Sequence, residues 1–293
     1  MAPVATFPLP ANLVAASRED GREAWLQLLP GEIEELAARW SLQLGHPFEP
    51  GGQTAWVAPV HHPAHGDAVL KVVWRHMECE DEAAGLRAWD GQGAVRVFAD
   101  ERLSETTTAL LLERCRPGSM LTACPEEEQD EVVGGLLLRL WRTHADLSPF
   151  RPLQVMCDYW ADSFERKLAA GTVHVDPALA RDGAHLFRAL PASADEEVLL
   201  CTDLHAENVL AAEREEWLVI DPKPFVGDPT YDALQHLLNC EERLLADPRG
   251  LAARVAGLLD LDPERLLTWL FARCIVDSDT WSWTLDVARA VRP

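Results

Sequence analysis

The sequence has no closely spaced C-x-x-C cysteine pair and no long run of apolar residues. Its seven cysteines are odd in number and scattered, as expected for reduced thiols rather than for a disulfide framework. No apolar run approaches the ~20 residues that a membrane-spanning helix needs. The N-terminal MAPVATFPLPANL also lacks the basic and apolar regions of a secretion signal. We therefore expect a cytoplasmic protein without a membrane association.

Basic residues are scarce as well. The chain has 26 lysines and arginines against 48 aspartates and glutamates, which gives a formal net charge of −22. Such a charge repels nucleic acids and anionic membranes and attracts a small cationic ligand. An acidic surface that only keeps the protein soluble is the alternative explanation of the same charge.

At 293 residues the chain is long for one core, so two domains or one bilobal unit are expected. Residues 1–50 are predicted to form a peripheral helical cap, in which Ile33, Leu36, Ala37 and Trp40 share one face. The runs QTAWVAPV and DAVLKVVW, joined by the turn HHPAHG, predict a β-hairpin. A helix in MECEDEAAGLRAWDG and two further strands, AVRVFADE and TTTALLLER, follow.

The segment RCRPG interrupts this pattern, and the chain beyond it reads as helical except for two strands within 198–221. The predicted fold class is therefore α+β. An N-terminal lobe with an antiparallel sheet and a helix covers residues 1–115, and a larger, mainly helical C-terminal lobe covers 116–293. RCRPG is the predicted hinge.

Polar residues gather around the two strands of the second lobe. Asp203 and Asn208 lie in CTDLHAENVL, and Asp221 ends the strand WLVID. Pairing of VLAA with WLVI would bring them to one edge, where one carboxylate accepts a hydroxyl proton and the other oxygens hold Mg²⁺. Phosphoryl transfer requires these parts, together with positive charge over the phosphates.

Lys71 is the candidate for that positive charge, because it stands inside the otherwise apolar strand DAVLKVVW. A buried lysine needs an anionic partner. The following helix offers Glu78, Glu80 and Glu82, of which we select Glu82. Taken alone, Lys71 would more often be a solvated strand residue.

The order of these parts resembles the kinase-like fold. More narrowly, the chain is similar to the aminoglycoside phosphotransferase family, in its streptomycin 6-phosphotransferase and hydroxyurea phosphotransferase branch, over roughly residues 10 to 280. The segments that carry this resemblance are GGQTAWVAPV, VLKV, EAAGLRAWDGQGAVR, ALLLERCRPG, DLHAENVLAAE, WLVIDPKPFVGDPTYDALQHLLNC and LDPERLLTWLFAR.

The resemblance implies a role for each matching residue. Asp203 would be the catalytic aspartate, and Asn208 and Asp221 the magnesium ligands. Lys71, held by Glu82, would bind the α- and β-phosphates of ATP. The remaining nucleotide contacts would come from a loop over the phosphates and from hinge backbone groups at adenine: Gly51, Gly52, Gln53 and Thr54 for the loop, Glu113 and Cys115 for the hinge.

Some features depart from the protein-kinase pattern. Pro222 and Lys223 follow the aspartate where protein kinases carry D-F-G, and no A-P-E segment follows, which favours a small-molecule acceptor. GGQTAW replaces the glycine-rich motif, so an ordinary turn is an alternative there. For His205 a loop-bracing role is favoured over a role as base.

Acidic residues of the second lobe could bind a cationic acceptor through charge-assisted hydrogen bonds. The candidates are Asp232, Glu241, Glu242, Asp277 and Asp279, with Trp281 as an aromatic wall. Asp232 could instead brace a loop. Trp281 and Trp283 are expected to point to different sides, so that at most one lines a pocket.

The leading hypothesis is an ATP- and Mg²⁺-dependent kinase of an aminocyclitol antibiotic such as streptomycin. A kinase of hydroxyurea or of another small metabolite or amino sugar is an alternative, and GTP could replace ATP. A metal-dependent phosphoesterase would need more histidines, since only His236 follows His205. A non-catalytic binding protein on a kinase scaffold would be expected to have lost at least one of the proposed functional residues. All four are present: Lys71, Asp203, Asn208 and Asp221.

Overall fold

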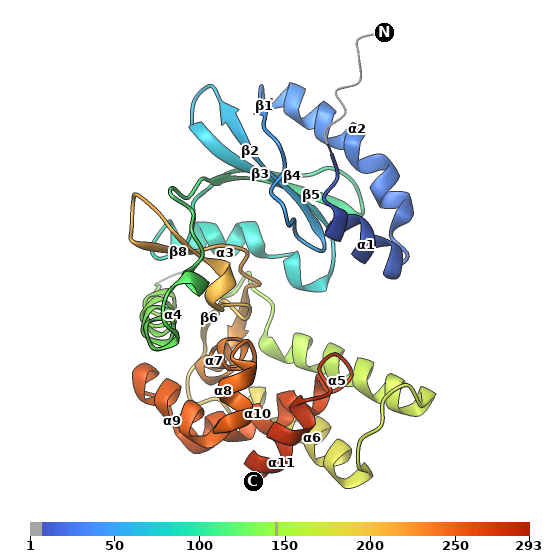
Figure 1. Cartoon of the computed structure of the whole chain (residues 1–293), viewed down its shortest axis with the longest axis vertical. Coiled ribbons are helices and arrows are strands. Elements are labelled where there is room, and N and C mark those ends of the chain that lie inside the picture. The colour runs from blue at the N-terminus through green and yellow to red at the C-terminus, as the bar shows by residue number, and fades with distance from the viewer. Residues whose placement is uncertain (1–7, 144–145) are drawn as a thin grey trace. The chain divides into compact units, whose positions relative to one another are not determined.

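The structure, a computed structural model, describes residues 8–143 and 146–293 (Figure 1). The first seven residues of the N-terminal segment discussed above therefore lie outside the described part. The chain folds into two compact units. The first runs to Gly91 and includes Val95–Arg116, and the second comprises Gln92–Ala94 and Pro117–Pro293.

A five-stranded antiparallel sheet forms the centre of the first unit. The strand order is β1-β2-β3-β5-β4. The predicted hairpin is confirmed, with His62 opposite Gly66 across its turn. The strands are β1 (Gln43–Leu44), β2 (Ala55–His62), β3 (Gly66–Trp74), β4 (Val97–Arg102) and β5 (Thr107–Glu113).

Two helices, α1 (Ala11–Glu19) and α2 (Glu23–Arg39), pack along one side of this sheet (Figure 1). Leu29, Ile33 and Leu36 of α2 have no exposed surface, and full burial of such side chains stabilises a fold by about 1.5–3 kcal/mol each. The predicted shared face of Ile33, Leu36 and Ala37 is confirmed, because all three are buried, whereas the helical region ends at Arg39 and does not extend to residue 50. Shortly after Arg39 the chain enters β1, in which Gln43 and Leu44 pair with β2.

The opposite side of the sheet carries Lys71. Successive strand residues point to alternate faces. Leu70 and Val72 belong to the core beneath α1 and α2, so Lys71 faces the other way. Helix α3 (Glu82–Trp89) supplies its partner there, and a single 3₁₀ turn (Met77–Cys79) precedes this helix.

The second unit is mainly helical, as predicted. Four of its helices begin with an aspartate whose side chain accepts a backbone N–H, followed by a proline at the first helical position. The sequence marks these starts four times as Asp-Pro. The helices are α4 (Glu126–Trp141), α5 (Leu153–Ala170), α6 (Pro177–Ala189), α7 (Pro229–Leu238), α8 (Glu241–Ala246), α9 (Pro248–Leu259), α10 (Pro263–Val276) and α11 (Thr284–Val291).

Helix α10 lies in the core of this unit and packs against α6, α7, α9 and α11. A side chain at Gly183 of α6 would come within 2.5 Å of Ile275, so the close approach of α6 and α10 requires a glycine there. Trp269 of α10 is fully buried, and its Nε1 donates to Asp228, the N-cap of α7, at 2.6 Å. The core thereby fixes the start of α7.

Two short antiparallel pairs complete the second unit. Strand β6 (Val198–Leu200) pairs with β9 (Phe225–Gly227), and β7 (Val209–Ala211) pairs with β8 (Trp217–Val219). The predicted pairing of VLAA with WLVI is confirmed.

Two structural findings concern the cysteines and the helices. All seven cysteines are free thiols, four of them buried. Within the described residues, none of the helices combines the length and the apolar character that crossing a bilayer requires.

Candidate active site

The β7–β8 hairpin positions two of the predicted site residues. Asn208 directly precedes β7, and Asp221 follows β8 after one residue. Since Val209 pairs with Val219 and the N–H of Ile220 donates to the carbonyl of Asn208 at 2.9 Å, the two ends of the hairpin lie side by side. Local strand pairing therefore brings Asn208 and Asp221 together.

Asp203 is joined to the same group through Asn208. Nδ2 of Asn208 donates to the backbone carbonyl of Asp203 at 2.9 Å and lies 3.5 Å from its Oδ2. These bonds assign the amide nitrogen to the loop, which leaves the amide oxygen to serve as a ligand atom. We call Asp203, Asn208 and Asp221 the catalytic-loop cluster.

The backbone is strained at one residue of this cluster and at the residue that precedes Asp203. Thr202 and Asp221 have φ values of 53° and 54°, in the left-handed region that residues other than glycine rarely adopt. Each such residue costs on the order of 1–3 kcal/mol, and such costs concentrate at functional sites. The surrounding hydrogen bonds must therefore hold the loop in place.

Asp232 supplies much of that support. Its carboxylate accepts from the backbone N–H groups of Cys201 and Thr202, at 2.9 and 2.5 Å, and from Nε1 of Trp141 at 2.8 Å. Burial raises the pKa of Asp232 to about 6, against the three hydrogen bonds, which lower it. At neutral pH the carboxylate is thus ionised and braces the residues just before Asp203.

With no exposed surface, Asp232 cannot reach a substrate, and its assignment to the acceptor site is wrong. The loop-bracing alternative describes its position correctly. The sequence could not separate the two, because the burial of Asp232 depends on Trp141, which is 91 residues away along the chain.

His205 is nearly buried within the loop. Its Nε2 lies 4.0 Å from Oδ1 of Asp203, and burial lowers the pKa of the imidazole, which is therefore neutral at neutral pH. Within the described part of the chain Nδ1 has no hydrogen-bond partner. The predicted brace through a backbone hydrogen bond is present, since the backbone carbonyl of His205 accepts from the N–H of Asn208 at 2.9 Å.

In the first unit the structure brings Lys71 and Glu82 together. Nζ of Lys71 lies 2.6 Å from both carboxylate oxygens, and the two residues are 5% and 1% exposed. Two short hydrogen bonds to one carboxylate hold the Lys71 side chain in one place. The sequence suggested Glu82 because it begins a helix after the strand.

The loop from Gly51 to Thr54 lies between β1 and β2 and is tied to the helices of the first unit. The N–H of Gly51 donates to Oδ1 of Asn12 at 2.9 Å, and Arg22 donates to the carbonyl of Gln53 at 3.2 Å. A side chain at Gly51 would approach Pro10 to 2.8 Å, so packing alone accounts for this glycine. Phosphate contacts of this loop remain a prediction.

The two predicted adenine-binding residues lie at the end of the sheet of the first unit. Glu113 ends β5, and its N–H donates to the carbonyl of Arg96 at 2.8 Å, while Cys115 follows in the connecting segment. Their contacts with a base also remain a prediction.

The acidic acceptor candidates other than Asp232 are distributed over two places. Glu241 and Glu242 begin α8 and are exposed. Asp277, after α10, accepts from Nε of Arg273 at 2.6 Å, and Asp279 forms an ion pair with Lys167. Their contacts with substrate are untested predictions.

Trp281 and Trp283 do not point to different sides. Their ring centroids are 6.3 Å apart with planes inclined by 23°, so the rings stack. The expectation assumed a strand or helix, whereas this segment is a turn, in which alternation does not apply. Both rings therefore contribute to one surface.

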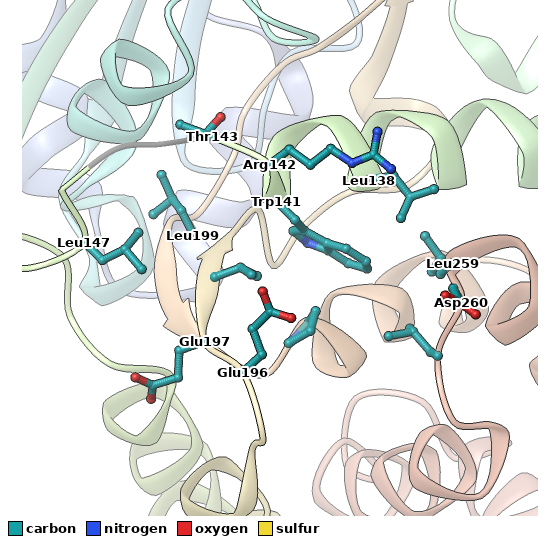
Figure 2. A pocket seen from close by; sticks show the side chains of 13 residues that line it. Leu138, Trp141, Arg142, Thr143, Leu147, Glu196, Glu197, Leu199, Leu259 and Asp260 are labelled. Atoms are coloured by element: carbon teal, nitrogen blue, oxygen red, sulfur yellow. The ribbon is translucent and has the colours of Figure 1, made fainter.

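A cavity of about 890 Å³ lies at the start of β6, the strand that leads into the catalytic loop (Figure 2). Leucines and three acidic residues line it, together with Trp141, whose indole nitrogen is bound to Asp232. Trp141 thus connects the cavity wall to the loop brace. The acidic residues are Glu196, Glu197 and Asp260.

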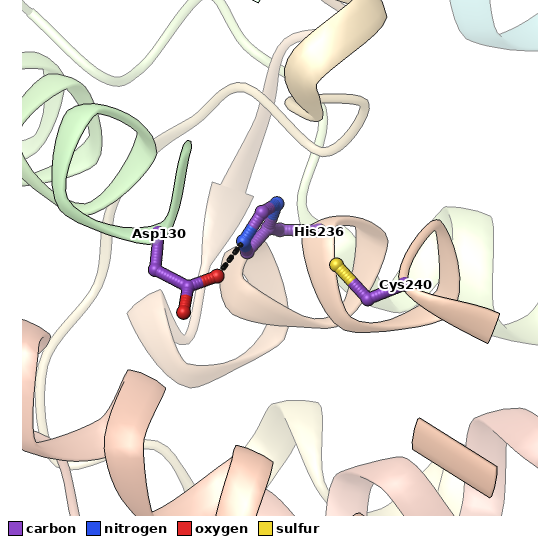
Figure 3. A group of neighbouring side chains, drawn as sticks. All are labelled: Asp130, His236 and Cys240. Carbon is purple, nitrogen blue, oxygen red and sulfur yellow. Dashed lines mark hydrogen bonds and ion pairs between the residues drawn. The ribbon is translucent and has the colours of Figure 1, made fainter. Parts of the chain in front are cut away.

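A second cluster joins four helices of the same unit (Figure 3). Asp130 of α4 has no exposed side-chain surface and accepts from Nε2 of His236 at 2.8 Å, from Arg243 at 2.7 Å and from Arg254 at 2.7 Å. Cys240 lies close enough to complete a set of three metal ligands with Asp130 and His236. The two guanidinium groups already supply the positive charge on Asp130, so we interpret the group as a structural ion network.

This network predicts a pH-dependent stability. Burial would raise the pKa of Asp130, but hydrogen bonds from His236, Arg243 and Arg254 hold it well below its ordinary value of 3.8. The stabilisation is therefore complete above about pH 5 and is lost as the pH falls below 4. We expect Asp130→Asn to lower the free energy of unfolding by about 3 kcal/mol at pH 7.

Denaturant unfolding of the wild type and of Asp130→Asn between pH 7 and pH 3 measures this effect. The difference between the two proteins should shrink in acid. A difference that stays constant over this range would contradict the assigned pKa.

The sequence analysis gave no role to Trp141 or Lys223. Lys223 was visible as a departure from D-F-G, but nothing in the sequence indicated that its side chain is buried beside Asp221. Trp141 carried no local signal beyond its place at the end of a long helix.

Comparison with solved structures shows the fold of the chain. The chain resembles the crystal structure of a thermostable mutant of aminoglycoside phosphotransferase APH(4)-Ia in ternary complex with ADP and hygromycin B. The TM-score is 0.58 at 17% identity, over 88% of this chain and 97% of that one. The fold is thus the bilobal, kinase-like α+β fold, as predicted.

The sequence identifies the family. Residues 39–285 match the model of the aminoglycoside/hydroxyurea antibiotic resistance kinases, and the chain belongs to this family. It is 34% identical to a hydroxyurea phosphotransferase of Kitasatospora aureofaciens, over 94% of this chain and 81% of that protein. It is 32% identical to a streptomycin 6-kinase of Streptomyces glaucescens, over 92% and 87% of the two chains.

Proposed function

We propose that the protein is an ATP- and Mg²⁺-dependent O-phosphotransferase that acts on a hydroxyl of an aminocyclitol antibiotic such as streptomycin. The observation that supports this most directly is the catalytic-loop cluster. The β7–β8 hairpin holds Asn208 beside Asp221, and the side chain of Asn208 binds the backbone of Asp203. The streptomycin 6-kinase relatives support the choice of acceptor.

Asp203 would act on the acceptor. Its carboxylate orients the hydroxyl and accepts its proton while the hydroxyl oxygen attacks the γ-phosphorus. The bond from that phosphorus to the β–γ bridging oxygen breaks, and ADP leaves with the bond's electron pair. The bracing of the loop by Asp232 keeps Asp203 in the orientation that in-line transfer demands.

Asn208 and Asp221 fit a magnesium ion, because they offer an amide oxygen and a carboxylate, the hard oxygen ligands that this ion prefers. The Asp221 side chain is 38% exposed, so an ion arriving from solvent can reach it. When bound, Mg²⁺ would offset the charge that develops on the phosphates.

Lys71 would hold the α- and β-phosphates, fixed by Glu82. Backbone groups of Glu113 and Cys115 would bind the base, and the loop of Gly51, Gly52, Gln53 and Thr54 would cover the phosphates. ATP is proposed as the donor; a direct comparison with GTP tests that choice.

The acceptor is proposed to be cationic. A net charge of −22 attracts such a molecule, and Glu241, Glu242, Asp277, Asp279 and Trp281 are proposed to bind it. The reaction is placed in the cytoplasm, where ATP is available and thiols stay reduced. Neither nucleic acid nor membrane is proposed as a partner.

Hydroxyurea is the second candidate acceptor, because the matching family model and one relative carry its name. It is small and uncharged, so its recognition would not need the acidic residues. Charge-neutralising variants such as Glu241→Gln and Asp279→Asn should weaken turnover of streptomycin and leave that of hydroxyurea unchanged.

The test is ADP release from Mg·ATP and from Mg·GTP with streptomycin, hydroxyurea, other aminoglycosides and amino sugars, followed by mass spectrometry of the products. A product heavier by one phosphoryl group is expected with streptomycin. Phosphoester hydrolysis without ATP would replace the proposal by a phosphoesterase, and failure to bind Mg·ATP in calorimetry would replace it by a non-catalytic binding protein.

A further inference from the structure

Lys223 is the one lysine of the second unit that is buried beside the catalytic-loop cluster, within the part of the chain described. Its Nζ donates to the carboxylate of Asp221 and, at 3.2 Å, to the carbonyl of the same residue. The Lys223 side chain is 11% exposed, against 38% for Asp221. The ammonium thus lies on the inner side of the carboxylate.

The backbone of Lys223 is bound to the residues that precede Asp203. Its N–H donates to the carbonyl of Cys201 at 2.8 Å, and its carbonyl accepts from Oγ1 of Thr202 at 2.6 Å. Pro222 stands between Asp221 and Lys223, and its ring restricts its own φ angle. The backbone of Lys223 is therefore fixed beside Asp221, while its flexible side chain can still turn from one anionic partner to another.

This arrangement bears on metal binding. Asp221 is a proposed magnesium ligand, yet in this structure its charge is already compensated by a buried ammonium. A divalent ion that joins the carboxylate is repelled by that ammonium, which lies within hydrogen-bond distance of the same carboxylate. Phosphate groups of a nucleotide would remove the conflict by giving the ammonium a new anionic partner.

We propose that Lys223 is a positioning residue that makes metal binding depend on the nucleotide. Without nucleotide, Lys223 holds Asp221 in its left-handed conformation and competes with a divalent ion for the carboxylate. When Mg·ATP binds, Lys223 exchanges the carboxylate for phosphate oxygens, and Asp221 binds the ion. The inference rests on the proposed function, since it assigns Asp221 to the metal.

The experiment measures Mn²⁺ binding to the nucleotide-free protein by electron paramagnetic resonance. We expect Lys223→Met to bind Mn²⁺ about tenfold more tightly than the wild type, because the competing charge is gone. Turnover of Mg·ATP should fall in the same variant. A purely structural role of Lys223 would weaken both properties together.

Three further variants make the comparison specific. Lys223→Gln also removes the charge but keeps a hydrogen-bond donor at the same site. It should bind Mn²⁺ more tightly than the wild type, and it replaces Lys223→Met in the test if Lys223→Met folds poorly. Lys167→Met removes a lysine that pairs with Asp279 and should leave Mn²⁺ affinity unchanged. Asp221→Asn should abolish the gain when it is combined with Lys223→Met.

The outcomes separate the two proposals. Unchanged or weaker Mn²⁺ binding by both Lys223 variants, in a protein whose wild type turns over Mg·ATP, overturns the role of Lys223 alone. A wild type that neither binds nor turns over Mg·ATP overturns the proposed function. Tighter Mn²⁺ binding with lower turnover supports the inference.

Discussion

Asp203→Asn is expected to lower turnover by on the order of 10²-fold or more while leaving the fold and ATP binding intact. The amide has the same shape as the carboxylate but cannot accept the hydroxyl proton. Asn208 donates to the backbone carbonyl of Asp203, at 2.9 Å, and that bond survives the substitution. The loop should therefore keep its conformation, so the loss would come from chemistry.

Two measurements check this expectation, and one control accompanies them. Single-turnover ADP release should fall steeply, whereas the dissociation constant of Mg·ATP from calorimetry should change little. Asp195→Asn is a matched control, because Asp195 is an exposed aspartate of the same unit. Near-normal turnover in Asp203→Asn would remove Asp203 from the role of base.

Substitutions in the Lys71–Glu82 pair should affect the stability of the protein and its activity in different ways. Glu82→Leu removes the carboxylate from an ammonium that is only 5% exposed. Breaking a buried ion pair from one side costs about 3–5 kcal/mol, because a charge is left without compensation. We expect Glu82→Leu to lower the unfolding free energy by that amount and to abolish turnover.

The double variant Lys71→Met/Glu82→Leu separates the two effects. Replacing both partners of a buried ion pair by apolar residues of similar volume is often neutral for stability. The double variant should therefore recover most of the lost stability but stay inactive, since no ammonium remains for the phosphates. Denaturant unfolding and ADP release measure the two quantities, and a double variant with restored turnover would exclude Lys71 from nucleotide binding.

The sequence by itself determined the features that depend on neighbouring residues along the chain. The apolar residues around Lys71 in DAVLKVVW indicated a buried lysine that needs an anionic partner, and the apolar runs around Asn208 and Asp221 defined the hairpin that joins them. Both require only local strand geometry. The bilobal α+β class followed from the same patterns, with the resemblance to the kinase-like fold.

Only the tertiary structure decided what happens to side chains whose neighbours lie far away in sequence. Asp232 was assigned to an acceptor pocket, but it is fully buried and bound to Trp141 of α4 and to the backbone that precedes Asp203. Asp130 collects its three hydrogen-bond partners, one histidine and two arginines, from three other helices. Lys223 stands two residues from Asp221, yet its burial is set by the catalytic loop packed against it. The burial of a side chain and the compensation of its charge depend on all the residues around it in space. A local sequence pattern does not show which residues these are.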